Sequence, residues 1–167
     1  MANQDTVFSS SIKYSGIFSF SSFYKFCYDW LSEEAGFDVS EDKYAESISG
    51  DSKKIDINWS GSKGFTDYFK GKITVSFNVS GLKDVEIANN GGKIKTNKGG
   101  IKIGIKGILI KDPSGKFEMT AFNQFLRSIY EKWVITSRIG ELEGKIAGAC
   151  DEFLAQSKAF LDLEGRK

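Results

Sequence analysis

A strict alternation of apolar and polar residues over residues 68–79 constrains the fold more than any other feature of the sequence. The apolar set is Phe69, Gly71, Ile73, Val75, Phe77 and Val79, and the polar set is Tyr68, Lys70, Lys72, Thr74, Ser76 and Asn78. A period of two places the two sets on opposite faces of a β-strand. One packed face and one solvated face are typical of an antiparallel sheet, so we expect such a sheet here.

Flanking segments predict the other strands of this sheet. A weaker pattern favours a first strand over residues 6–17, and Ile55, Ile57 and Trp59 alternate with polar residues. A last long strand is expected over residues 101–110. This strand becomes apolar on both faces near its end, so we expect that end to be covered on both sides.

Glycine and asparagine mark the expected turns. Asn89-Asn90-Gly91-Gly92 predicts a hairpin turn because its residues tolerate positive φ. We expect a second turn at Asn97-Lys98-Gly99-Gly100 and a further change of direction at Gly81. The sheet would then have four or five strands.

The remaining segments have helical periodicity. Ser19, Ser21 and Ser22 can cap a helix over residues 22–35, which Gly36 would end. Thr120 can cap a second helix that runs to a break near residues 136–137, and a third is expected over residues 138–163. The first two apolar stripes are Phe23, Phe26, Cys27, Trp30 and Leu31; and Phe122, Phe125, Leu126, Ile129, Trp133 and Val134. The third has strictly alternating spacings of three and four residues and one polar member, Gln156, and predicts a coiled-coil-like seam along the last helix: Ile139, Leu142, Ile146, Ala149, Phe153, Gln156, Phe160 and Leu163. We therefore expect one α+β domain over residues 1–167, an antiparallel sheet with an N-terminal helix and two C-terminal helices packed on one face.

The chain lacks the residue types that several common kinds of catalysis require. The chain has no His, which removes the commonest general base and metal ligand. Cys27 and Cys150 form no CxxC, and both lie on apolar helix faces, so we interpret them as buried free thiols. Adjacent acids diverge, and none of the glycine clusters fits a phosphate-binding loop. We therefore expect no enzyme, no catalytic or metal site and no cofactor.

No apolar run approaches the ~20 residues that span a bilayer, and the N-terminus lacks the pattern of a signal peptide. We therefore expect a soluble chain, cytoplasmic or virion-associated, with no membrane insertion.

Surplus aromatic and glycine residues point to subunit contacts. Tyr24 and Tyr28 lie off the apolar stripe of the first helix, and Tyr130 lies beside that of the second, so all three are candidate interface residues. Gly140, Gly144 and Gly148 line one stripe of the last helix. This stripe has three interpretations: a poorly optimised helix, close packing on a helix of the same chain, or close packing on a second subunit.

Charge is segregated although the net charge is only +1. Residues 29–46 carry seven acids, among them Glu33, Glu34, Glu41 and Asp42, whereas residues 88–111 carry six lysines and no acid. The lysine-rich hairpin has three interpretations: a solvated sheet face, a contact with the acidic segment of a neighbouring subunit, or a nucleic-acid surface. Its charged patch is Lys93, Lys95, Lys98, Lys102 and Lys106.

Four segments, FYKFCYDWL (23–31), TDYFKGKITVSF (66–77), GLKDVEI (81–87) and FLRSIYEKWVITSRI (125–139), together resemble small uncharacterised α+β proteins of archaea, their viruses or phages. The resemblance implies no activity and favours a structural or assembly role. Our leading hypothesis is a non-enzymatic, self-associating structural or assembly protein, such as a virion component, whose partners are itself or other assembly subunits. The alternative is a nucleic-acid-binding module that uses the Lys-rich hairpin 93–111.

Overall fold

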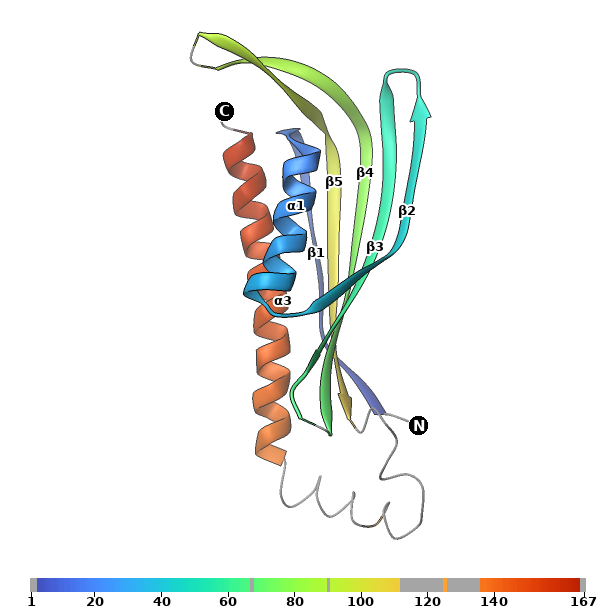
Figure 1. Cartoon of the computed structure of the whole chain (residues 1–167), viewed down its shortest axis with the longest axis vertical. Helices are drawn as coiled ribbons and strands as arrows, with labels where there is room; N and C mark the ends of the chain where they lie inside the picture. The colour runs from blue at the N-terminus through green and yellow to red at the C-terminus, as the bar shows by residue number, and fades with distance from the viewer. Residues whose placement is uncertain (1–2, 67, 90, 112–124, 126–135, 166–167) are drawn as a thin grey trace.

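In a computed structural model the chain forms an antiparallel sheet with helices on one side (Figure 1). The structure describes residues 3–66, 68–89, 91–111, 125 and 136–165. The elements are β1 (Asn3–Phe18), α1 (Phe20–Asp29), a π-helical turn η1 (Trp30–Glu34), β2 (Asp38–Ser49), β3 (Ser52–Gly64), β4 (Phe69–Asn89), β5 (Gly92–Lys111) and α3 (Thr136–Glu164). The expected α+β class is thus confirmed.

The sheet has five strands in the order β1-β5-β4-β3-β2, and every neighbouring pair is antiparallel. The alternating segment forms the first half of β4, in the middle of the sheet, with its apolar set buried. The acidic segment supplies the edge strand β2, which begins at Asp38 and has only Val39 buried. The sequence pattern did not indicate a strand over residues 38–43, because a solvated edge strand has no packed face to impose alternation.

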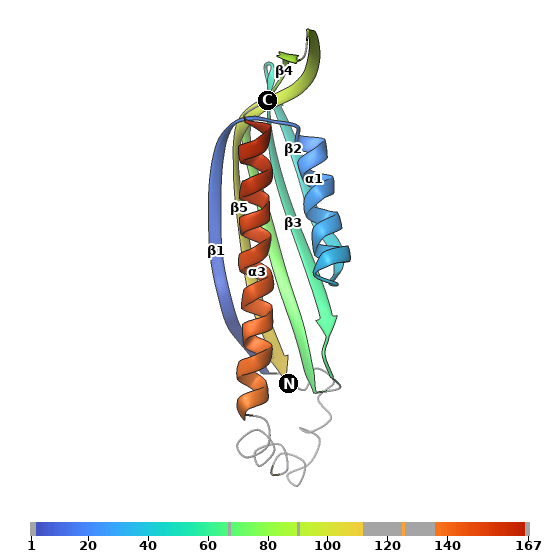
Figure 2. The same cartoon turned by 90° about the vertical axis from the view of Figure 1, so that its left-hand side faces the viewer.

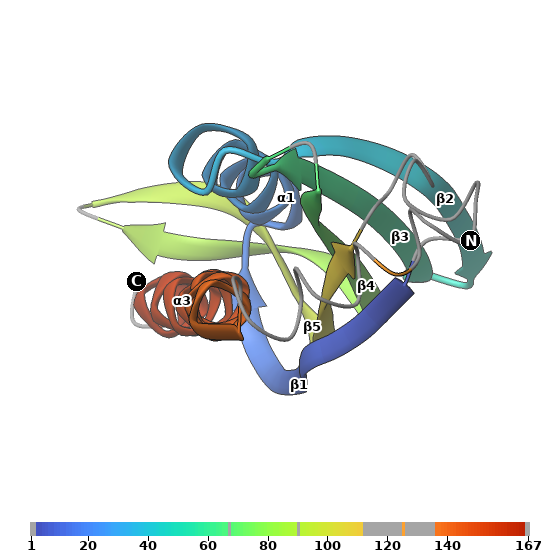
Figure 3. The ribbon, with the colours of Figure 1, turned by 90° about the horizontal axis from the view of Figure 1, so that it is seen from below.

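Helices α1 and α3 lie side by side on one face of the sheet, here called the helix face (Figures 2 and 3). Together with the inward side chains of all five strands they enclose one apolar core. Aromatic rings join the layers: Phe23 of α1 meets Phe77 of β4 edge to face, and Phe26 stacks on Phe160 of α3. The opposite side of the sheet, here called the outer face, carries no helix among the described residues.

The first helix is confirmed, with its start and end shifted. Ser19 is the N-cap and its Oγ accepts a hydrogen bond from the backbone N of Ser22. Gly36 ends the helical segment with φ +76°, as expected for a glycine after a helix. Phe23, Cys27 and Leu31 are fully buried, and the two cysteines are free and buried as predicted.

The last helix is confirmed. The row of residues expected to be buried along its whole length does not match the buried residues in its C-terminal half. A strict 3-4 alternation predicted burial of Gln156 and Leu163, yet both are exposed. A straight α-helix has 3.6 residues per turn, so a heptad seam drifts by about 20° per heptad and leaves the packed side. The buried positions are Leu142, Ile146, Cys150, Phe153, Leu154, Ser157 and Leu161.

Two expected turns are wrong because the strands run through them. β4 continues past Gly81 to Asn89, β5 runs through residues 97–100, and the register between the two strands shifts between Ser80 and Lys83. Gly81 adopts φ +61° at this bulge. A Cβ on Gly99 would lie 2.9 Å from Leu82 Cα, so that glycine allows close backbone approach instead of a turn.

The predicted hairpin is confirmed, with Asn89 paired to Gly92 and Gly91 at φ +82°. The expected covering of the last strand on both faces is also confirmed, since Ile108, Leu109 and Ile110 are all buried. The expected second helix, with Tyr130, lies outside the described residues. The expectation of two C-terminal helices therefore stays a prediction. Phe125, the one described member of its stripe, is 60% exposed, contrary to expectation.

Candidate interaction surfaces

The aromatic residues Tyr24 and Tyr28 lie on the side of α1 that faces β3. Each ring meets the buried Trp59 edge to face, at centroid distances of 5.2 and 5.8 Å. The Tyr24 hydroxyl donates to Glu41 Oε1 at 2.6 Å. Burial and this hydrogen bond raise the pKa of Tyr24 to about 12. These contacts give both tyrosines a role within the chain, and their use as an interface stays a prediction.

No described residue lies against the glycine stripe of α3. Gly140, Gly144 and Gly148 are exposed, and a Cβ added at any of them would meet no described atom within 4 Å. The alternative that the stripe packs on a helix of the same chain is therefore not observed within the described residues. A contact with a second subunit stays a prediction.

The predicted lysine patch is divided between the two faces of β5. Asn97 Oδ1 accepts the backbone N–H of Phe20, so its side of the strand faces α1, and by alternation Lys93 and Lys95 share that side. Lys95 lies directly opposite Glu86 of β4. Lys98, Lys102 and Lys106 lie on the outer face. The fold therefore does not place the five lysines on one face of the hairpin, as the sequence indicated.

The acidic patch is divided as well. Glu33 and Glu34 are exposed on η1, in the helix layer. Ordinary alternation along β2 places the adjacent acids Glu41 and Asp42 on different faces of the strand. Glu41 Oε1 accepts hydrogen bonds on the helix face from Tyr24 and Trp59, while Asp42 Oδ1 accepts one from Ser60 Oγ on the outer face.

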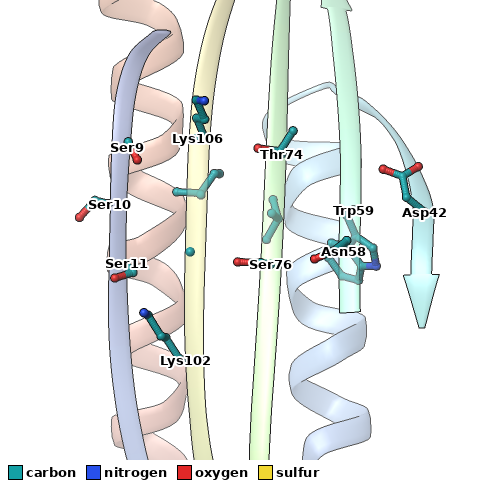
Figure 4. Close-up of a pocket in the computed structure, with 13 residues that line it drawn as sticks. Ser9, Ser10, Ser11, Asp42, Asn58, Trp59, Thr74, Ser76, Lys102 and Lys106 are labelled. Carbon is teal, nitrogen blue, oxygen red and sulfur yellow. The ribbon is translucent and has the colours of Figure 1, made fainter. Parts of the chain in front are cut away.

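A shallow hollow of about 680 Å³ lies on the outer face and receives residues from all five strands (Figure 4). Lys102 and Lys106 of β5 flank Gly104 in its centre. The neighbouring strands contribute the hydroxyl groups of Ser9 and Ser11 from β1 and of Thr74 and Ser76 from β4, with Asn58 and Asp42 on the far side.

Sequence reasoning named Lys102, Lys106 and Asp42 but did not bring them together, and it missed the hydroxyl groups. The sequence feature that could have indicated these hydroxyl groups is the recurrence of Ser and Thr at the polar positions of the alternating segments that form β1 and β4. Only the strand order places β1 and β4 on either side of β5, and so gathers these residues around Gly104.

A third surface lies at the end of the molecule where both hairpins and the C-terminal end of α3 are found (Figure 1). Ile48, beside the β2–β3 turn, is 69% exposed, and Ile94, beside the β4–β5 turn, is 38% exposed. Leu163 near the end of α3 is 63% exposed. Large apolar side chains are thus presented to solvent by three separate elements at one end.

Two kinds of site are not found in the part of the chain that the structure describes. No group of three or more Cys, Asp or Glu residues there could hold a metal ion. No helix within the described ranges is both long enough and apolar enough to cross a membrane.

The described part of the chain defines an α+β protein with a five-stranded antiparallel sheet. No family model matches it, and no curated protein does. A solved structure of an uncharacterised protein from Rhizobium leguminosarum aligns over 98% of this chain and 99% of that chain, with 8% identity and a TM-score of 0.26. A likeness at that TM-score carries no argument about function. The resemblance to archaeal, viral or phage proteins stays an expectation.

Proposed function

We propose that the protein is a non-enzymatic, self-associating structural or assembly protein, such as a virion or other particle component, and that copies meet through the hairpin end. The observation that carries this proposal is the exposure of Ile48 and Ile94 beside the two hairpin turns. Ile48 and Ile94 belong to separate hairpins at one end of the molecule, where contact with a second copy would remove large apolar side chains from water.

The outer part of the β4–β5 hairpin supports the proposal because it lacks lateral strands. The pairing of β3 with β4 ends at Leu82, and that of β1 with β5 ends at Asn97. A two-stranded ribbon is marginally stable in water by itself, so packing against another copy would stabilise it. The ribbon face away from α1 carries Val85, Ile87 and Ile94, and Ile87 and Ile94 form a direct cross-strand pair.

Charge supports a defined orientation between copies. The exposed acids Glu33 and Glu34 lie in the helix layer, whereas Lys98, Lys102 and Lys106 lie on the outer face, so the sheet separates the two groups within one chain. Complementary patches on opposite sides of a subunit favour head-to-tail contacts, which form rings or filaments.

Sedimentation velocity over a concentration series tests the proposal. We expect species larger than the 18.5 kDa monomer at micromolar concentration, and a shift toward monomer in Ile48→Lys and Ile94→Lys. Ser47→Lys is the matched control, because Ser47 is exposed on the opposite face of the same strand. A monomer at every concentration and salt level would overturn the proposal, as would equal effects of Ser47→Lys and Ile48→Lys.

The runner-up is a nucleic-acid-binding module that uses the hairpin 93–111. Three exposed lysines on the outer face, Lys98, Lys102 and Lys106, favour it, while the turning of Lys93 and Lys95 toward α1 shortens the row of phosphate contacts. This function predicts retention on duplex DNA or RNA at low salt that falls steeply as salt rises. An electrophoretic shift assay in dilute salt distinguishes it from self-association without nucleic acid.

A further inference from the structure

The outer-face hollow has a cationic wall that nothing else in the described chain neutralises. Lys102 and Lys106 form no ion pair with any described acid, and Lys102 lies directly opposite Lys13 of β1. Like charges directly opposite on neighbouring strands are destabilising. The other such pair, Lys83 and Lys98, has an acid beside it, because Lys83 Nζ lies 3.7 Å from Asp51. Lys13 lies outside the hollow, beside Lys102, and an anion between Lys102 and Lys106 would supply the missing charge at the hollow itself.

Gly104 makes room for a ligand between the two lysines. In the sheet register it lies between Ser11 of β1 and Ser76 of β4. A Cβ on Gly104 would lie 3.1 Å from Ser76 Oγ, so a side chain there would occupy the floor of the hollow. Four residues along a strand span about 13 Å, which is the distance between the Cα atoms of Lys102 and Lys106.

Hydrogen-bond donors surround this gap. Ser9 and Thr74 lie on either side of Lys106, as Ser11 and Ser76 do for Gly104. None of these four hydroxyl groups has a side-chain hydrogen bond within the described residues. Figure 4 shows them on β1 and β4 around the β5 lysines. Lysine ammonium groups and hydroxyl donors together match the several acceptor oxygens of a phosphate group.

The two sides of the hollow differ in charge, with lysines on the β5 side and an acid on the β2 side. Asp42, which accepts a hydrogen bond from Ser60, lies three strand spacings or about 14 Å from β5. Asn58 is exposed between them. A carboxylate and an amide at this side would repel a second phosphate but accept hydrogen bonds from hydroxyl groups. The one aromatic residue at the hollow, Trp59, is buried on the helix face, so no ring is available to stack on a base.

We infer that the outer-face hollow binds a small phosphorylated polyhydroxyl compound of the sugar phosphate class, with the phosphate between Lys102 and Lys106 and the hydroxyl groups toward Asn58 and Asp42. The volume of about 680 Å³ suits a ligand of this size. The hollow lies apart from the hairpin end, and binding is measured on the monomer because the charge contact proposed between copies would also use Lys102 and Lys106.

Isothermal titration calorimetry with glucose 6-phosphate as the probe tests the inference. We expect one site per chain with a Kd of about 1 mM or tighter. Lys102→Gln and Lys106→Gln should each weaken binding by roughly tenfold, the size of a lost charge-assisted hydrogen bond. Lys98→Gln is the matched control because Lys98 is exposed on the same face of the same strand but outside the hollow.

A second variant pair tests the floor of the hollow. Gly104→Ala should weaken binding, whereas Gly100→Ala, whose Cβ would meet Ser80 Oγ at an ordinary 3.5 Å, should not. Absence of binding, an equal loss in Lys98→Gln, or equal affinity for glucose would overturn the inference. Equal affinity for inorganic phosphate would overturn the sugar component, and duplex DNA that binds tightly and competes at Lys102 and Lys106 would favour a nucleic-acid surface instead.

Discussion

The Tyr24 hydroxyl donates a hydrogen bond to Glu41 Oε1 across 2.6 Å, and so ties helix α1 to the edge strand β2. The same oxygen accepts the indole N–H of Trp59 at 3.2 Å. Trp59 is buried beneath the Tyr24 ring, so this acid brings three elements together. Besides its backbone pairing with β3, the edge strand β2 is thereby joined to the helix layer through one carboxylate.

Removal of the Tyr24 hydroxyl should therefore destabilise the fold. Tyr24→Phe keeps the ring packing on Trp59 and removes one hydrogen bond to a charged group, which contributes roughly 1.5–3 kcal/mol when buried and less at this partly exposed site. We expect a loss of about 1 kcal/mol in the free energy of unfolding, measured by urea denaturation. Tyr28→Phe is the control, because the Tyr28 hydroxyl has no hydrogen bond to any described residue; equal losses in both variants would refute the role of Glu41.

The same interaction predicts a loss of stability at alkaline pH. The pKa of Tyr24 is raised from 10.0 to about 12 in the folded chain, so the folded state keeps a proton that the unfolded state releases. Stability from this group is complete below pH 10 and is lost as pH rises toward about 12. Urea denaturation over this range should show a shallower decline in Tyr24→Phe than in the unaltered chain. Identical slopes would contradict this assignment.

The sequence predicted those parts of the fold in which one face is packed. Strict alternation located β4 because every second residue from Phe69 to Val79 enters the core. The α1 stripe and the Asn-Gly hairpin were predicted for similar local reasons. By contrast, β2 is solvated along nearly all of its length, and Gly81 and Gly99 meet at a bulge that depends on the register between two strands. Such features arise from pairing and carry no local signal.

The candidate sites show the same division. The lysines and acids were visible as charged segments, but which face each side chain occupies depends on strand parity. A shift of one residue moves a side chain to the other face. The sequence alone therefore could not separate Lys93 and Lys95 from Lys102 and Lys106, or place Asp42 at the outer-face hollow.

Both cysteines should be unreactive in the folded chain. Cys27 and Cys150 are buried, and burial raises the pKa of both thiols, that of Cys150 to about 12. The thiolate is the reactive form, so little of it exists near neutral pH. A chromogenic disulfide reagent should label neither residue without denaturant and both in urea. Rapid labelling of one thiol under native conditions would contradict the packing of α1 or α3.

A methyl group at Gly107 should be poorly tolerated, because this glycine lets α3 approach β5 closely. A Cβ there would lie 2.7 Å from Ile146 Cγ2 and 2.9 Å from Cys150 Sγ. Both atoms are in the buried core, so Gly107→Ala must move the helix or the strand. Overpacking of this kind costs about 1–3 kcal/mol.

Gly100→Ala provides the comparison for this variant on the same strand, since its nearest contact at 3.5 Å is ordinary, and it should leave the free energy of unfolding nearly unchanged. The cost of Gly107→Ala should also shrink in an Ile146→Ala background, because that change removes the Cγ2 atom that the new methyl group meets. Urea denaturation of the four chains of this double-mutant cycle measures the coupling. Additive costs would show that the close approach of α3 to Gly107 does not determine the packing of helix on sheet.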